Sequence, residues 1–165
     1  MRAFIVAGIV GPLMTVAMAC HHAPRTPPVA IKPDSVAGIV SITGTAFEQH
    51  IVLRSGQVVI PLSAATSDSA ALSRMGGVQV DVVGTWGPNL SFRVESFTAE
   101  YVAGSPVVDG FVRKEGDRLA LETTHGTIPL GNPPTALRSM IGARVWIGGP
   151  LDKGPNTYGV IVPAQ

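Results

Sequence analysis

The sequence predicts a mainly β protein, built from two tandem small five-stranded barrels that each carry one short helix. Three observations lead to this fold class. Glycine (19) and proline (14) are frequent in the 165 residues, and apolar residues make up 45% against only 14% charged residues, a composition typical of short strands joined by turns. The chain resembles itself beyond residue 34. Within each copy, apolar and polar residues alternate over short segments, the period of a half-buried strand.

The internal repeat is carried by four markers that recur in the same order, 65 to 72 residues apart. The clearest pair is LSRMGGVQVDVVG (72–84) and LRSMIGARVWIGG (137–149), which agree at five of thirteen positions. The other markers are GQVVIPL (56–62) with GTIPL (126–130), Gly-Pro-Asn at 87–89 and 154–156, and Gly-x-Val at 38–40 and 110–112. We therefore expect a tandem duplication, with one barrel at 35–104 and a second at 105–165.

Each unit is expected to run strand, strand, strand, short helix, strand, strand. In the first unit the apolar segments predict strands at 36–42, 50–53, 58–62, 78–83 and 91–100. A helix is expected at 67–75, beginning at Asp68 or Ser69 and ending at Gly76-Gly77.

The fourth strand of each unit shows which side chains should point into the barrel. Period-two alternation places Val78, Val80 and Val82 inward. In the second unit the inward positions are Ala143, Val145 and Ile147, and the outward ones are Arg144, Trp146 and Gly148.

Five strands with a helix between the third and the fourth is the order of the OB-fold barrel. The pattern Leu-x-x-Met-x-Gly-x-x-Val-x-Val-x-Gly, with a Gly-x-Val first strand, also resembles small OB-like domains common in bacterial envelope proteins, over residues 35–163. The resemblance implies a way of packing and names no ligand. An SH3-like barrel or one larger sandwich stays open as an alternative.

The first nineteen residues have the pattern of a signal peptide. Arg2 is followed by an uncharged, apolar run from 3 to 19. Ala17-Met18-Ala19-Cys20 then resembles the lipobox of bacterial lipoproteins, which implies that Cys20 is the lipidated first residue of the mature chain, with the lipid bilayer as its partner. The expected location is the bacterial cell envelope. Alternatives are an uncleaved membrane anchor, an ordinary secretory cut that leaves a secreted or soluble periplasmic protein, and a cysteine that is simply buried.

A proline-rich stretch separates this cysteine from the repeat. Prolines recur between Pro24 and Pro33, and such a composition favours an extended tether without a packed core. We expect the tether to occupy residues 20–34.

The two tryptophans are the candidate contact residues. By analogy with other OB-like barrels, binding is expected at the loops 84–89 and 149–156, where Trp86 would be the apolar anchor or, alternatively, a plug for the barrel end. Trp146 is the residue expected to join the two barrels, or else a lone exposed aromatic.

We expect a non-enzymatic binding or structural module for an envelope protein, a glycan or a small ligand, with no cofactor, no metal site and no catalytic residue. Lysine and arginine (12) balance aspartate and glutamate (11) and aromatic residues are 5%, which disfavours nucleic acid as a partner. Cys20-His21-His22 offers the alternative of a secreted metal-handling protein.

An enzyme, or an accessory subunit of one, is the remaining alternative. It would use the carboxylates of the second barrel, and a pocket that joined Asp109 or Glu122 to His125 would favour it. We expect these carboxylates instead to lie on a solvated face: Asp109, Glu115, Asp117 and Glu122.

Overall fold

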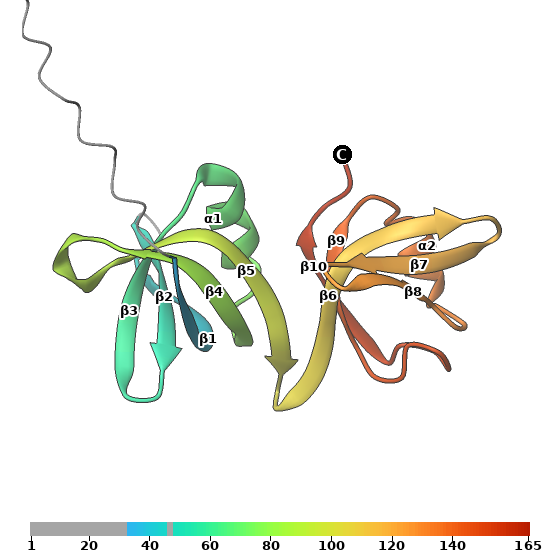
Figure 1. Cartoon of the computed structure of the whole chain (residues 1–165), viewed down its shortest axis with the longest axis horizontal. Coiled ribbons are helices and arrows are strands. Elements are labelled where there is room, and N and C mark those ends of the chain that lie inside the picture. Colours follow the sequence, from blue (N-terminus) through green and yellow to red (C-terminus); the bar gives the residue numbers. More distant parts are fainter. Residues whose placement is uncertain (1–32, 46–47) are drawn as a thin grey trace, which may run out of the picture. The chain divides into compact units, whose positions relative to one another are not determined.

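The computed structural model describes residues 33–45 and 48–165, which belong to one compact unit. Ten strands and two short α-helices in this part of the chain form two successive five-stranded units, so the predicted fold class is confirmed. We call them barrel 1 (β1 to β5) and barrel 2 (β6 to β10) (Figure 1). The predicted signal peptide and all but the end of the predicted tether lie outside the described residues.

Barrel 1 is a closed barrel. Strand β1 pairs with β2 and β4, β2 with β3, β3 in parallel with β5, and β4 with β5, so that every strand has two neighbours. The 3₁₀ turn η1 lies between β4 and β5. The elements are β1 (Asp34–Gly44), β2 (Gln49–Ser55), β3 (Val58–Ser63), α1 (Thr66–Ser73), β4 (Val78–Trp86), η1 (Pro88–Leu90) and β5 (Phe92–Val102).

Barrel 2 repeats this order but stays open. Strand β6 pairs with β7 and β9, β7 with β8, and β9 with β10, while no pairing joins β8 to β10 in the described part of the chain. The elements are β6 (Ser105–Glu115), β7 (Arg118–Thr123), β8 (Gly126–Pro129), α2 (Thr135–Arg138), β9 (Arg144–Gly148) and β10 (Thr157–Val162).

Close packing of two strands explains why the first glycine of the sequence repeat recurs in both barrels. A Cβ atom on Gly38 would lie 2.6 Å from the carbonyl oxygen of Arg54, and one on Gly110 would lie 2.5 Å from that of Glu122. A leucine side chain crowds the same space in both barrels. Only glycine lets the two strands approach this closely.

The turn after each helix is also the same in both barrels. Gly77 donates its N–H to the carbonyl of Val40 at 2.9 Å, and Gly142 donates to that of Val112 at 2.8 Å. Both glycines have left-handed φ angles, +84° and +89°, which glycine adopts without steric cost. The hydrogen bond fastens each helix-to-strand turn onto the first strand of its own barrel.

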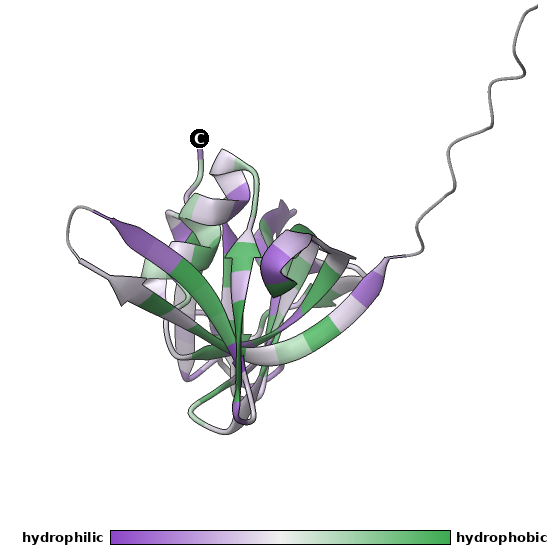
Figure 2. Cartoon of the chain, turned by 90° about the vertical axis from the view of Figure 1, so that its left-hand side faces the viewer, coloured by the Kyte–Doolittle hydropathy of each residue, from purple (hydrophilic) through white to green (hydrophobic). Residues whose placement is uncertain are grey.

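The predicted inward positions of the fourth strands are buried. Val80, Val82, Val145 and Ile147 are fully covered, and Val78 and Ala143 almost so. Figure 2 shows the alternation as bands of apolar and polar colour along the strands. Gly148, which was expected to face outward, is also buried, because the Thr157 side chain of β10 lies against it.

Several predicted boundaries differ by a few residues, and two of the differences have a clear physical reason. Helix α1 begins at Thr66, after Ala65, whose carbonyl accepts the first helical hydrogen bond from Ser69 at 2.8 Å. Asp68 therefore lies in the first turn, where its charge favours the helix dipole, and does not cap the helix. Strand β1 begins at Asp34, inside the predicted tether, because it pairs with Gly84 of β4.

The two barrels follow each other with only a tight turn between them. Ala103 and Gly104, with φ of +48° and +78°, connect β5 to β6, which form a short hairpin. Ile161 of β10 is part of the barrel 1 core, and Val107 packs against that core. Hydrophobic residues of the second repeat thus complete the core of the first.

Among the described residues, none of the helices has the length and hydropathy that crossing a bilayer requires.

Candidate functional site

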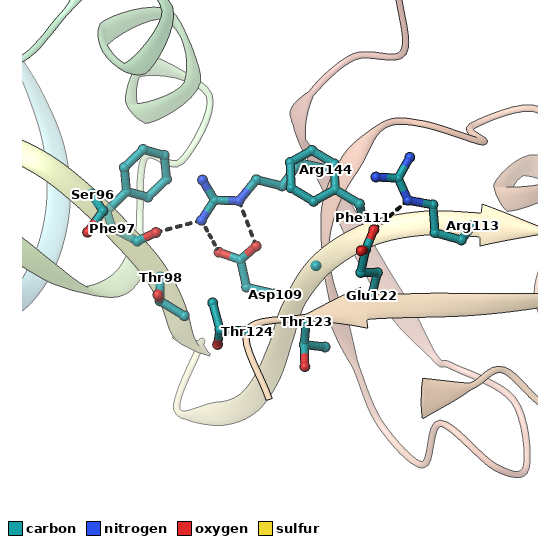
Figure 3. A pocket seen from close by; sticks show the side chains of 11 residues that line it. Ser96, Phe97, Thr98, Asp109, Phe111, Arg113, Glu122, Thr123, Thr124 and Arg144 are labelled. Atoms are coloured by element: carbon teal, nitrogen blue, oxygen red, sulfur yellow. Dashed lines mark hydrogen bonds and ion pairs between the residues drawn. The ribbon is translucent and has the colours of Figure 1, made fainter. Parts of the chain in front are cut away.

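A pocket of about 470 Å³ lies where β5 of barrel 1 meets β6, β7 and β9 of barrel 2. Its lining combines two phenylalanines, two arginines, two carboxylates and four hydroxyl side chains. We call it the Arg144 pocket (Figure 3).

A buried ion pair forms its inner wall. Arg144 donates from Nε and Nη2 to the two carboxylate oxygens of Asp109, both at 2.8 Å. The Asp109 side chain is only 3% exposed and that of Arg144 20%. Two parallel hydrogen bonds between a guanidinium and a carboxylate fix both groups in position.

Barrel 1 supplies the remaining partners of this pair. Arg144 also donates to the carbonyl of Phe97 at 2.5 Å, and Asp109 accepts from the N–H of Ala99 at 2.9 Å. The Arg144 guanidinium lies 4.5 Å from the centre of the Phe97 ring. The pair is therefore satisfied by groups of both barrels, and it joins β5 to β6 and β9.

A second ion pair lies at the pocket mouth. Arg113 of β6 donates from Nε to Glu122 of β7 at 2.5 Å, and both side chains are about half exposed. The Arg113 guanidinium also lies 5.5 Å from the centre of the Phe111 ring, which is itself 39% exposed. Both carboxylates of the pocket are thus paired with an arginine.

Hydroxyl groups complete the lining. The Thr123 hydroxyl is used by the turn that follows it, accepting from the N–H of His125 and donating to the carbonyl of Gly126. Among the described residues, the hydroxyls of Ser96, Thr98 and Thr124 take part in none of the side-chain hydrogen bonds. They remain available to a ligand.

The structure places the two predicted contact residues outside the Arg144 pocket. Trp86 is the last residue of β4 and is 47% exposed, with its ring edge-on to Phe92 at 5.0 Å. Trp146 is half-buried, covers Gly159 of β10 and packs against the barrel 1 core. Neither lines the Arg144 pocket, and Cys20, His21 and His22 lie outside the described residues.

The predicted loop 149–156 borders a different hollow. Gly149, Leu151 and Asp152 line a pocket of about 950 Å³ on barrel 2, together with residues of β7 and β8. The Gly131 N–H donates to the Leu151 carbonyl at 2.8 Å and holds the loop against the end of β8. This pocket contains no ion pair among the described residues, so we take the Arg144 pocket as the better built site.

The expectation of a solvated face is wrong for Asp109. The sequence predicts Asp109 as one surface carboxylate among several, yet its side chain is almost completely buried. A signal was present, because Asp109 stands between apolar residues in VVDGFV, and a charge within a half-buried strand is almost always paired. The pocket joins Asp109 and Glu122, while His125 lies outside its lining. Compared with protein-family models and with curated proteins, the chain matches none.

Proposed function

We propose that this protein is a non-enzymatic binding module of the bacterial cell envelope, held at a membrane by lipid on Cys20, and that the Arg144 pocket takes a neutral saccharide. The observation that carries the proposal is the internal pairing of the pocket's charges. Asp109 and Glu122 each face an arginine at hydrogen-bond distance.

Paired charges select against a charged ligand. An anion would have to draw Arg144 or Arg113 away from its carboxylate, and breaking the buried pair leaves an uncompensated charge. A neutral ligand leaves both pairs intact. It can hydrogen-bond to the open hydroxyls of Ser96, Thr98 and Thr124 and place an apolar face on the exposed Phe111 ring. Saccharides combine hydroxyl groups with such apolar faces.

The same pairing argues for binding rather than catalysis. A general acid or base needs a carboxyl group that is free to exchange a proton with the substrate. Both carboxylate oxygens of Asp109 accept hydrogen bonds from Arg144 or Ala99, and Glu122 accepts one from Arg113. An enzyme that used these carboxylates would need Asp109 or Glu122 to be released from its arginine partner.

Titration of the isotope-labelled mature chain with saccharides, followed by amide NMR, tests the pocket. Neutral probes, maltotetraose and tetra-N-acetylchitotetraose, are expected to shift the amides of Ala99, Phe111 and Thr124, while the cationic chitosan tetramer and the anionic oligogalacturonate are not. Phe111→Ala should abolish the shifts. Tyr101→Ala, which removes an equally exposed aromatic outside the pocket, should retain them.

Three outcomes would contradict the proposal. Shifts caused only by a charged probe would show that the ion pairs open for a ligand. Shifts by no probe would exclude a saccharide of these classes. Cleavage of a probe during the titration would favour the enzyme that uses Asp109 or Glu122.

A further inference from the structure

The loop between β4 and β5 carries two large apolar side chains into solvent. Leu90 is 79% exposed, more than any other large apolar side chain among the described residues, and Trp86 is 47% exposed. Figure 1 shows this segment, in yellow-green, projecting from barrel 1. We call residues 86–91 the Trp86 loop.

The exposure of Leu90 is imposed by the backbone. Asn89 and Leu90 have φ angles of 57° and 56°, in the left-handed region, which leucine adopts only at a steric cost. The loop is closed by a hydrogen bond from the Gly87 N–H to the Ser91 carbonyl and by another from the Ser91 hydroxyl to the Pro88 carbonyl, both at 2.8 Å. A closed, strained loop that holds a leucine outward points to a contact made by that leucine.

The Trp86 loop lies at the edge where the chain enters barrel 1. Asp34, the first residue of β1, pairs with Gly84, and Trp86 follows two residues later on the same strand. Cys20 is 14 residues before Asp34, a stretch of chain that spans at most about 50 Å. An anchor on Cys20 therefore keeps this edge of barrel 1 within about 50 Å of the membrane surface, so that the loop can reach the bilayer.

We propose that the Trp86 loop is a membrane-contact element that inserts Trp86 and Leu90 into the interfacial region of the bilayer. The inference rests on the proposed lipid anchor. Tryptophan favours the membrane–water interface because its ring is apolar while its N–H stays hydrogen-bonded, and leucine gains by leaving water for the acyl region. The loop itself carries no charge, so insertion is apolar and insensitive to salt.

The test uses the single cysteine of the chain. The mature chain from residue 20, coupled through Cys20 to a maleimide lipid in phosphatidylcholine vesicles, is anchored whether or not cells acylate it. With Trp146→Phe, Trp86 is the only tryptophan, and excitation at the red edge of indole absorption leaves the two tyrosines silent. We expect its emission to shift to the blue on anchoring and to be quenched by brominated acyl chains, equally at low and high salt.

Variants separate the loop from other exposed residues. Leu90→Ser should reverse most of the shift and quenching. Val58→Ser, which changes another strongly exposed apolar residue in barrel 1, should leave both unchanged. If Trp146→Phe does not fold, the unsubstituted chain can be labelled with 5-fluorotryptophan at both tryptophans. The Trp86→Phe variant then assigns the two fluorine resonances. Broadening of the Trp86 resonance by a nitroxide lipid reports the same membrane contact.

Two results would overturn the proposal. Trp86 that stays unquenched, with the emission of a water-exposed indole, would show that the loop does not meet the bilayer. Protection of Trp86 in native membranes but not in protein-free vesicles would assign the loop to a protein partner. Because the vesicle anchor is chemical, the result in vesicles does not depend on native acylation of Cys20, which mass analysis tests separately.

Discussion

At the scale of single residues, the Asp109–Arg144 pair determines the character of the pocket. Asp109 receives three hydrogen bonds, two from Arg144 and one from Ala99, and is almost completely removed from water. The sequence shows that Asp109 and Arg144 stand in strands. It does not show that they meet, because the contact joins positions 35 residues apart through strand pairing that depends on the whole barrel.

Replacing Asp109 by asparagine should destabilise the protein strongly. Asparagine keeps the size of the side chain but leaves the largely buried guanidinium of Arg144 without its counter-charge, at a cost of about 3 kcal/mol in the free energy of unfolding. Urea unfolding measures this change. Glu122→Gln, at the half-exposed pair, is the matched control, and it should cost less than about 1 kcal/mol. Equal losses in the two variants would show that burial of the Asp109–Arg144 pair has no energetic weight.

At the scale of elements, the internal repeat predicted the order of strands and helices better than the individual segments predicted their boundaries. The fourth strands, the helix position and the glycines follow from local pattern, since alternation and turn chemistry act over a few residues. The extra length of β1 does not, because Asp34 becomes part of a strand only through its partner Gly84. Strand pairing between distant segments sets the start of β1.

The glycine in the first strand of each barrel should be irreplaceable. Gly110→Ala would place a methyl group against the Glu122 carbonyl, and forcing the strands apart should cost about 1–3 kcal/mol. Gly38→Ala should behave alike in barrel 1. Gly76→Ala, where an added Cβ meets open space and φ is ordinary, should be neutral or slightly stabilising. Thermal unfolding compares the three, and a tolerated Gly110→Ala would contradict the close approach.

At the scale of the whole molecule, the second repeat supports the first. Neighbouring residues of β10 face different cores: Ile161 is buried in that of barrel 1, while Val160 packs against that of barrel 2. The sequence predicted two units and suggested that Trp146 would join them. The sequence does not indicate that the last strand contributes to both cores, because the residues around Ile161 have the same alternating pattern as those of any other strand.

Ile161→Ala should therefore destabilise barrel 1, although it changes a residue of the second repeat. Loss of a fully buried isoleucine side chain costs about 2–5 kcal/mol. Hydrogen exchange should show faster exchange at the core strand β4. Val160→Ala is the control, and its effect should fall on β6 and β9. If Ile161→Ala left exchange in β4 unchanged, the two barrels would be energetically independent.

The proposed tether of this chain to a membrane through Cys20 is tested most directly by the intact mass of the mature N-terminal peptide. The peptide, released by proteolysis from protein purified out of native membranes, is predicted to begin at Cys20 and to carry the added mass of diacylglycerol on its sulfur. A peptide that begins at Cys20 with an unmodified thiol, or that still contains residues 1–19, would contradict the lipid anchor.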